Sequence, residues 1–453
     1  MKRLISLYND GKLIAAVRLA EKYIRRHPSV VLPYNIRGAS LLDLGKFEAA
    51  VLAFLKVIEL QPKSPEAHNN LGLAQQRAGK NDDAIASYRE AVTLKPQFSD
   101  AHNNLGVLLS DLGQSEGAID SYRTALFYTP SFAEAYNNLG TALADIDETA
   151  AAMEAYQQAI QIKPFYAEAH NNLGIVLQRL KQWGDSIDSY RRALKIDPHY
   201  AAAHNNLGGV LQEIGRLDDA LESYQHALNA QPEMINTLNN LGNIYRQLDR
   251  FDDAILNFNR ILAVDPNNAE AHNNLGIVYN KCFRFDEEKA CYTRALELEP
   301  NFLDARINLG GALLREEKYE EAIECYQAVD SNVESEKISA LILECYYRNG
   351  NRTAYDIQLQ LIKTRQSTYN FRAGAAAAFI AHQYGIDNLY RFCEKPIDKV
   401  CIFNVLRDGK IDKKFLNSLC QSLHDTDTYE RFSPGHISNG YKSVGNLFSK
   451  GNI

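Results

Sequence analysis

Pairs of neighbouring asparagines recur at intervals of 34 residues along most of the chain. Each asparagine side chain offers two N–H donors and one carbonyl acceptor, which complement a peptide backbone whatever its side chains. A row of such amides on one surface predicts a site for an extended peptide. The candidates are the second asparagine of each pair and one further asparagine at the same spacing: Asn70, Asn104, Asn138, Asn172, Asn206, Asn240, Asn274 and Asn308.

Histidines recur at the same interval, at His68, His102, His170, His204 and His272. Metal ligands must lie within about 2 Å of one ion, whereas equivalent residues on packed helices lie about 10 Å apart. We therefore predict a packing role for these histidines and no metal site. Paired carboxylates such as Asp218 and Asp219 are expected to favour helix N-termini. The sequence contains no phosphate-binding glycine loop and no nucleophile motif, so no catalytic residue and no cofactor are predicted.

The seven cysteines all lie at or after residue 282, and no two form a Cys-x-x-Cys motif. This pattern favours reduced thiols in a cytoplasmic protein over disulfides or a zinc site. No apolar run approaches the ~20 residues of a membrane span, and no signal peptide is recognisable. Before residue 337 the chain carries 46 acidic and 33 basic residues. Such an array suits a basic or neutral protein partner better than nucleic acid.

A 34-residue repeat must position these side chains. If each unit begins at residue 31 or a multiple of 34 later, position 8 is glycine in nine consecutive units, from Gly38 to Gly310. Position 20 is mostly alanine, position 24 is always aromatic, and position 32 is proline in eight units. This pattern resembles the tetratricopeptide repeat. The resemblance implies an all-α, right-handed superhelical solenoid of antiparallel helix pairs, and apolar residues three and four apart also predict two amphipathic helices per unit.

The repeat pattern divides the chain into four parts. A partial repeat covers residues 1–30, and nine repeats cover 31–336. Residues 337–385 are predicted to form a degenerate helical cap, which a solenoid needs at its end. Residues 386–453 form a small mixed tail.

The asparagines fall at positions 5 and 6, on the face of the first helix that positions 3, 4, 7, 8, 10 and 11 leave free of packing. In tetratricopeptide superhelices this face lines the concave groove, and the row is similar to the asparagine ladder of the protein O-GlcNAc transferases. Asparagine is a poor helix former, and the fifteen asparagines at these positions cost on the order of 10 kcal/mol of helix propensity. We predict peptide binding for position 6, with bonding to neighbouring helices as the alternative. For position 5, hydrogen bonding between repeats is the favoured interpretation.

Positions 12 and 13 vary between units and are candidates for partner specificity, with a solvated polar face as the alternative. The residues in question are Arg77, Gln178, Arg179, Gln212, Arg246, Asn280 and Lys281.

Two segments of the tail resemble bacterial proteins that join tetratricopeptide arrays to a 2-oxoglutarate/Fe(II) oxygenase. The matching residues are Tyr390, Phe392, Cys393, Pro396 and Asp398 in the first segment, and Gly440, Tyr441, Ser443, Gly445, Asn446, Leu447 and Phe448 in the second. Such an oxygenase needs a His-x-Asp…His iron site, and neither His424 nor His436 begins that motif. We therefore expect this chain to bind no iron.

The sequence as a whole predicts a scaffold that holds an extended protein or peptide segment in the concave groove, without nucleic acid or membrane. The alternative is the substrate-recruiting arm of an oxygenase whose catalytic core is missing from this chain. Self-association through the ends of the solenoid is a further alternative.

Overall fold

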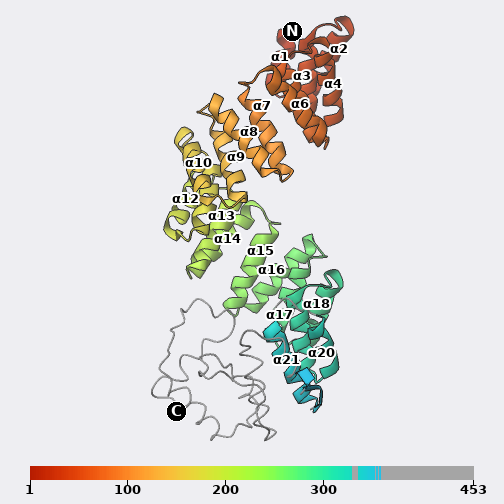
Figure 1. Cartoon of the computed structure of the whole chain (residues 1–453), viewed down its shortest axis with the longest axis vertical. Helices are drawn as coiled ribbons and strands as arrows, with labels where there is room; N and C mark the ends of the chain where they lie inside the picture. Colours follow the sequence, from red (N-terminus) through yellow and green to blue (C-terminus); the bar gives the residue numbers. More distant parts are fainter. Residues whose placement is uncertain (329–334, 352, 356, 359–453) are drawn as a thin grey trace. The chain divides into compact units, whose positions relative to one another are not determined.

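The computed structural model describes residues 1–328, 335–351, 353–355 and 357–358. All regular secondary structure in these residues is α-helical, which confirms the predicted all-α architecture (Figure 1). The predicted tail at 386–453 and much of the predicted cap lie outside the described residues. Within the described part of the chain, no helix combines the length and apolarity needed to cross a bilayer. The helices are α1 (Lys2–Asn9), α2 (Leu13–Arg26), α3 (Val31–Asp43), α4 (Phe47–Leu60), α5 (Pro65–Arg77), α6 (Asn81–Leu94), α7 (Ser99–Asp111), α8 (Ser115–Tyr128), α9 (Ala133–Asp145), α10 (Thr149–Ile162), α11 (Ala167–Arg179), α12 (Trp183–Ile196), α13 (Ala201–Glu213), α14 (Leu217–Ala230), α15 (Ile235–Gln247), α16 (Phe251–Val264), α17 (Ala269–Lys281), α18 (Phe285–Leu298), α19 (Leu303–Arg315), α20 (Tyr319–Gln327) and α21 (Ser335–Arg348).

The helices alternate between two roles, helix A for the odd-numbered and helix B for the even-numbered members from α3 to α20. A three-residue turn joins A to B in each repeat, so the two helices pack antiparallel. The chain divides into two compact units, and the division falls within α15, after Ile244. In the first unit, consecutive helices A from α3 to α13 also contact one another. In the second unit α17 contacts α19 in the same way.

The position-8 glycines exist because an aromatic ring lies directly against the helix A backbone. A Cβ atom added to Gly174 would lie 2.6 Å from Cε1 of Tyr190, closer than any ordinary contact. Tyr190 is completely buried, as are the position-20 alanines such as Ala118. Glycine at 8, a small residue at 20 and an aromatic at 24 are therefore one packing unit, in which the ring fills the space that the two small residues leave.

The turn between helices A and B requires a left-handed backbone conformation at position 15. Gly113 has φ of 71° there, and Asp147 has φ of 61° in the next repeat. Glycine adopts this conformation at no steric cost, whereas other residues incur about 1–2 kcal/mol. The sequence analysis did not single out this position, although glycine occurs there in four of the nine repeats.

Position 4 ties each helix A to the loop before it. The histidine Nε2 lies 2.9 Å from the proline carbonyl oxygen six residues earlier in the pairs His68–Pro62 and His102–Pro96. The rings of His170, His204 and His272 make the same contact at 3.1–3.3 Å. Because a carbonyl only accepts, Nε2 carries the proton in each case. The histidine row therefore has the structural role that the sequence predicted.

Candidate peptide-binding groove

Helix A has one buried face and one face that remains accessible. In α11, Ala169, His170, Gly174, Val176 and Leu177 are buried in the packing between helices. Asn172, Ile175 and Gln178 are half-buried and Arg179 is exposed. The accessible residues lie three and four apart, which places them on one face of the helix. This accessible face, repeated on neighbouring helices A, is the candidate groove.

The two asparagines of each pair form a ladder of hydrogen bonds between repeats. The position-6 amide donates from Nδ2 to Oδ1 of the position-5 asparagine in the preceding repeat. In the first unit these bonds run from Asn104 to Asn69, Asn138 to Asn103, Asn172 to Asn137, Asn206 to Asn171 and Asn240 to Asn205, at 3.0–3.3 Å. In the second unit Asn308 donates to Asn273 at 3.0 Å. The ladder therefore links neighbouring helices A as well as lining their accessible face.

The ladder leaves part of the six donating position-6 amides uncommitted. Every bond uses one of the two N–H donors. The carbonyl oxygens of Asn172 and Asn206 accept from Asn171 and Asn205 at 3.2 and 3.4 Å. No such bond to Oδ1 of Asn104 or Asn138 occurs among the described residues. Members of the row are half-buried, except Asn274, whose side chain is 8 % exposed.

A second row of polar contacts joins position 12 of helix A to position 24 of helix B. The hydroxyl groups of the position-24 tyrosines donate to glutamine Oε1 at position 12, in the pairs Tyr88–Gln76, Tyr190–Gln178 and Tyr224–Gln212, at 2.9–3.1 Å. Burial raises the pKa of all three phenols, so they stay neutral donors. Two predicted specificity residues, Gln178 and Gln212, thus use their carbonyl oxygen inside the repeat and keep the amide N–H groups for other contacts.

The predicted specificity arginines differ in their surroundings. Arg179 donates from Nη1 to the Ala144 carbonyl at 3.0 Å, at the C-terminal end of α9 in the preceding repeat. Arg77 is exposed at the end of α5. Arg246 is half-buried, and burial lowers the pKa of its guanidinium.

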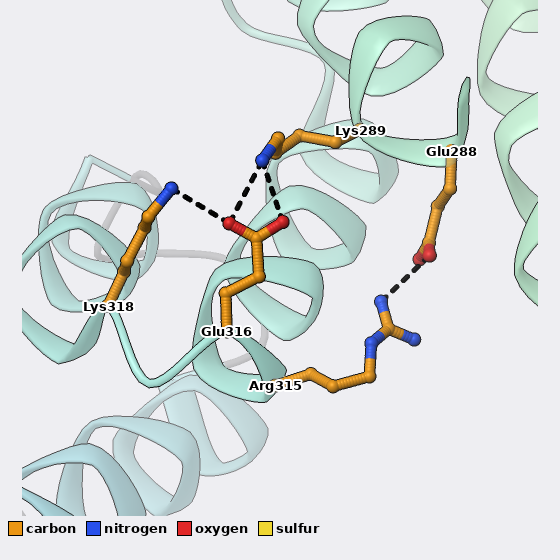
Figure 2. Close-up of polar contacts among 5 residues, drawn as sticks. All are labelled: Glu288, Lys289, Arg315, Glu316 and Lys318. Atoms are coloured by element: carbon orange, nitrogen blue, oxygen red, sulfur yellow. Dashed lines mark hydrogen bonds and ion pairs between the residues drawn. The ribbon is translucent and has the colours of Figure 1, made fainter. Parts of the chain in front are cut away.

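In the second unit a charged cluster links α18 of one repeat to α19 of the next (Figure 2). Glu288 stands at position 20, where the other repeats have a small residue, and only 2 % of it is exposed. Its carboxylate accepts from Asn280 Nδ2 at 2.8 Å and from Arg315 Nη2 at 2.7 Å. The Arg315 guanidinium also lies 4.2 Å from the ring centroid of Phe285. Predicted residue Asn280 is therefore part of this cluster, whereas the neighbouring Lys281 is exposed.

Sequence reasoning missed the pairing of Glu288 with Arg315. The signal was present, because Glu288 departs from the position-20 pattern and Arg315 occupies position 13 of the next repeat. A second ion-pair group lies beside it, in which Glu316 is bound by Lys289 at 2.6 Å and by Lys318 at 2.8 Å (Figure 2).

Comparisons with known proteins place this architecture in a family. The model of the Cilia and flagella-associated protein 70 C-terminal domain, a tetratricopeptide domain, matches residues 34–274, which is more than half of the chain. The chain belongs to this tetratricopeptide-repeat family. A general tetratricopeptide-repeat model also matches residues 2–65 and 284–335. Tetratricopeptide arrays are protein-interaction scaffolds, and this tetratricopeptide chain is one of them.

Several solved tetratricopeptide structures are similar to parts of the chain. A crystal structure of MamA is 29 % identical and has a TM-score of 0.34, with 36 % of this chain and 95 % of that chain covered. The structure titled "Crystal structure of YrrB: a TPR protein with an unusual peptide-binding site" is 22 % identical, with a TM-score of 0.36 and coverages of 42 % and 97 %. The APC/C hetero-tetramer Cut9-Hcn1 is 20 % identical, with a TM-score of 0.47 and coverages of 61 % and 54 %. No curated protein matches the sequence.

The cysteines in the described part of the chain are buried or half-buried. Cys282, Cys291, Cys325 and Cys345 are free thiols. Burial raises the pKa of Cys291 to about 11 and that of Cys345 to about 12. Burial therefore disfavours the thiolate, which is the reactive form, at both cysteines.

Proposed function

We propose that this tetratricopeptide chain binds an extended protein segment along the accessible face of helices A, with the position-6 asparagines as backbone contacts. The observation that carries the proposal is the ladder of bonds from position 6 to position 5. It fixes each amide before any ligand arrives, so binding does not have to order these side chains. Each fixed amide keeps one N–H donor, and Asn104 and Asn138 also keep their carbonyl acceptors.

The spacing of the ladder suits an extended chain. Equivalent points on packed helices lie about 10 Å apart, and an extended peptide rises about 3.3 Å per residue. One ladder amide is therefore available for about every third residue of the ligand. Contacts to the ligand backbone would fix its path, while the variable positions 9, 12 and 13 would select its side chains.

The test must separate the binding role of position 6 from its structural role. Changing Asn104 and Asn138 to alanine removes two position-6 amides and breaks their bonds to Asn69 and Asn103. Changing Asn69 and Asn103 to alanine breaks the same two bonds and keeps the position-6 amides. Peptides selected against the chain from a random phage-displayed library serve as ligands, and fluorescence anisotropy measures their affinity.

We expect the Asn104/Asn138 variant to lose at least about tenfold more affinity than the Asn69/Asn103 variant, because two contacts of about 1 kcal/mol each are removed. Circular dichroism and the urea midpoint show whether the two variants are equally folded. Equal affinities in two folded variants would contradict the proposal.

A second candidate is the recruiting arm of a 2-oxoglutarate/Fe(II) oxygenase, and it is favoured only by the tail segments around Cys393 and Tyr441. These segments lie outside the described residues, and they do not contain the His-x-Asp motif that an iron site needs. We assign no iron chemistry to this chain. Calorimetric titration with Fe(II) and 2-oxoglutarate under anaerobic conditions should show no binding. Saturable binding of both would favour the oxygenase hypothesis.

A further inference from the structure

The negative charge of the chain is concentrated in two adjacent repeats. Residues 99–162, which form α7 to α10, contain nine acidic residues and a single basic residue, Arg123. Their net charge is −8, against −7 for all 453 residues. The other residues before 337 carry 37 acidic and 32 basic side chains, a net charge of −5, so these two repeats present a locally strong negative potential.

Part of this charge lies at the edge of the candidate groove. Asp111 and Asp145 occupy position 13, are exposed, and are the last residues of α7 and α9. Burial raises the pKa of the Tyr122 phenol and Asp111 raises it further. Burial likewise raises the pKa of Tyr156 to about 12, with Asp145 adding to the rise against the hydrogen bond from Thr141. Each carboxylate therefore acts electrostatically on the position-24 phenol of its own repeat.

The two carboxylates do not stabilise the helices that carry them. A negative charge at a helix C-terminus opposes the macrodipole and costs about 0.3–1 kcal/mol. The adjoining turn adds Asp147, which holds a left-handed φ of 61° where four of the nine repeats have glycine, and Glu148. Within the described residues neither Asp111 nor Asp145 forms an ion pair, whereas Glu134 in the same repeat is paired with Lys163 at 2.8 Å.

The basic side chain that reaches the C-terminal end of α9 is bound to a backbone carbonyl. Arg179 of the next repeat donates to the carbonyl of Ala144, the residue before Asp145. In α9 Thr141 lies at position 9, with its hydroxyl 3.1 Å from that of Tyr156. The same two helices, α7 and α9, carry Asn104 and Asn138, whose carbonyl oxygens remain acceptors without a partner among the described residues. Negative charge and open acceptors thus coincide on one pair of helices A, and both favour donors on a ligand.

We propose that the α7–α10 section of the groove takes an extended basic segment of a partner protein, with Lys or Arg side chains about three residues apart facing Asp111 and Asp145. This inference rests on the proposed groove function and names the class of ligand. The spacing follows from the repeat, because about 10 Å between equivalent positions corresponds to three residues of extended chain. Polynucleotides are excluded by their charge, since phosphates would face a net charge of −8.

The test uses the full chain and four labelled 13-residue probe peptides in a Gly-Ser-Ala background. One carries lysine at every third residue, one has the same lysines grouped at one end, one has glutamine in place of lysine, and one has glutamate. The variant Asp111→Asn with Asp145→Asn removes two groove charges. The variant Asp120→Asn with Glu154→Gln removes two exposed charges from helices B of the same two repeats, α8 and α10, and is the matched control.

At low salt we expect the spaced-lysine peptide to bind about tenfold more tightly than the glutamine peptide, with an advantage of up to about fivefold per charge pair. This preference should disappear in the Asp111/Asp145 variant, persist in the Asp120/Glu154 variant and shrink as salt screens the charges. The glutamate peptide should bind most weakly.

Other outcomes separate the two proposals. Equal binding of the lysine and glutamine peptides would overturn the basic-segment inference and leave the groove intact. Equal loss of preference in both double variants would also overturn it, because the charge would then act at long range without a site. Grouped lysines that bind as tightly as spaced ones would overturn the three-residue spacing. Failure of every peptide, including the glutamine peptide, would count against the groove itself.

Discussion

The repeats at α7–α10 and the repeats at α17–α20 share one backbone pattern but treat charge in opposite ways. In α7–α10, position 20 is a buried alanine and position 13 is an exposed aspartate without an ion-pair partner among the described residues. In α17–α20, position 20 of the first repeat is the buried Glu288, and it binds Arg315 at position 13 of the next. The first arrangement leaves charge exposed at the edge of the candidate groove, while the second pairs charge inside the protein.

In both regions some positions fix the packing of the repeat, while others vary from repeat to repeat. Positions 8 and 24 are glycine and aromatic in both regions, because ring and backbone must fit. The side chains at positions 13 and 20 differ in charge and size between the two regions, while the helices A keep the same length. Position 13 is accessible in both regions, so substitutions there alter the surface of the candidate groove.

The largest effect is expected from breaking the buried pair. Arg315→Ala leaves the Glu288 carboxylate buried with only Asn280 as its hydrogen-bond donor, and should destabilise the second unit by about 3 kcal/mol. The double variant Glu288→Ala with Arg315→Ala restores the alanine that most repeats have at position 20 and should recover most of that loss. Urea unfolding, with hydrogen exchange of α18 and α19 as the local readout, measures both. A double variant less stable than Arg315→Ala would show that Glu288 stabilises the unit by more than its charge pairing with Arg315.

A smaller effect separates core from groove within a single helix. Gly208 and Gly209 are neighbours in α13, but a Cβ at Gly208 would lie 2.7 Å from Tyr224 Cε1, and one at Gly209 would lie 3.8 Å from the Tyr224 hydroxyl oxygen. Gly208→Ala should therefore destabilise by about 1–3 kcal/mol through overpacking. Gly209→Ala should stabilise by about 0.5–1 kcal/mol, since alanine is the better helix former. Thermal unfolding of the two variants checks this, and a shift of the same sign in both would refute the division between positions 8 and 9.

The residues that recur in nearly every repeat are the ones whose roles could be predicted from sequence. Gly174, Tyr190 and Pro198 repeat because packing and helix termination repeat, so the period alone revealed the helix pairs. The direction of the ladder bond, from Asn172 to Asn137, could not be predicted, because it depends on how two repeats are offset. The pairing of Glu288 with Arg315 is also non-local, since 27 residues separate the partners. A single departure from the pattern, such as glutamate at position 20, marks where such a contact should be sought.

The smallest effect extends the comparison to position 4, where α11 and α13 use histidine and α19 uses Arg306, which donates to the Pro300 carbonyl. Burial lowers the pKa of His170 and of His204 from the ordinary 6.5. The Nδ1 atom of His170 is buried and has no partner among the described residues, so a second ring proton would have no acceptor. The unfolded chain therefore binds protons more readily than the folded one, and stability falls as the pH drops below about 6.5.

Hydrogen exchange should show α11 and α13 opening more at pH 5.5 than at pH 7.5, while α19 changes less because its arginine stays charged. Replacing both histidines with tyrosine, as at position 4 in Tyr34, keeps a donor to the proline carbonyl and should remove the difference; an unchanged pH response in that variant would assign it to other groups.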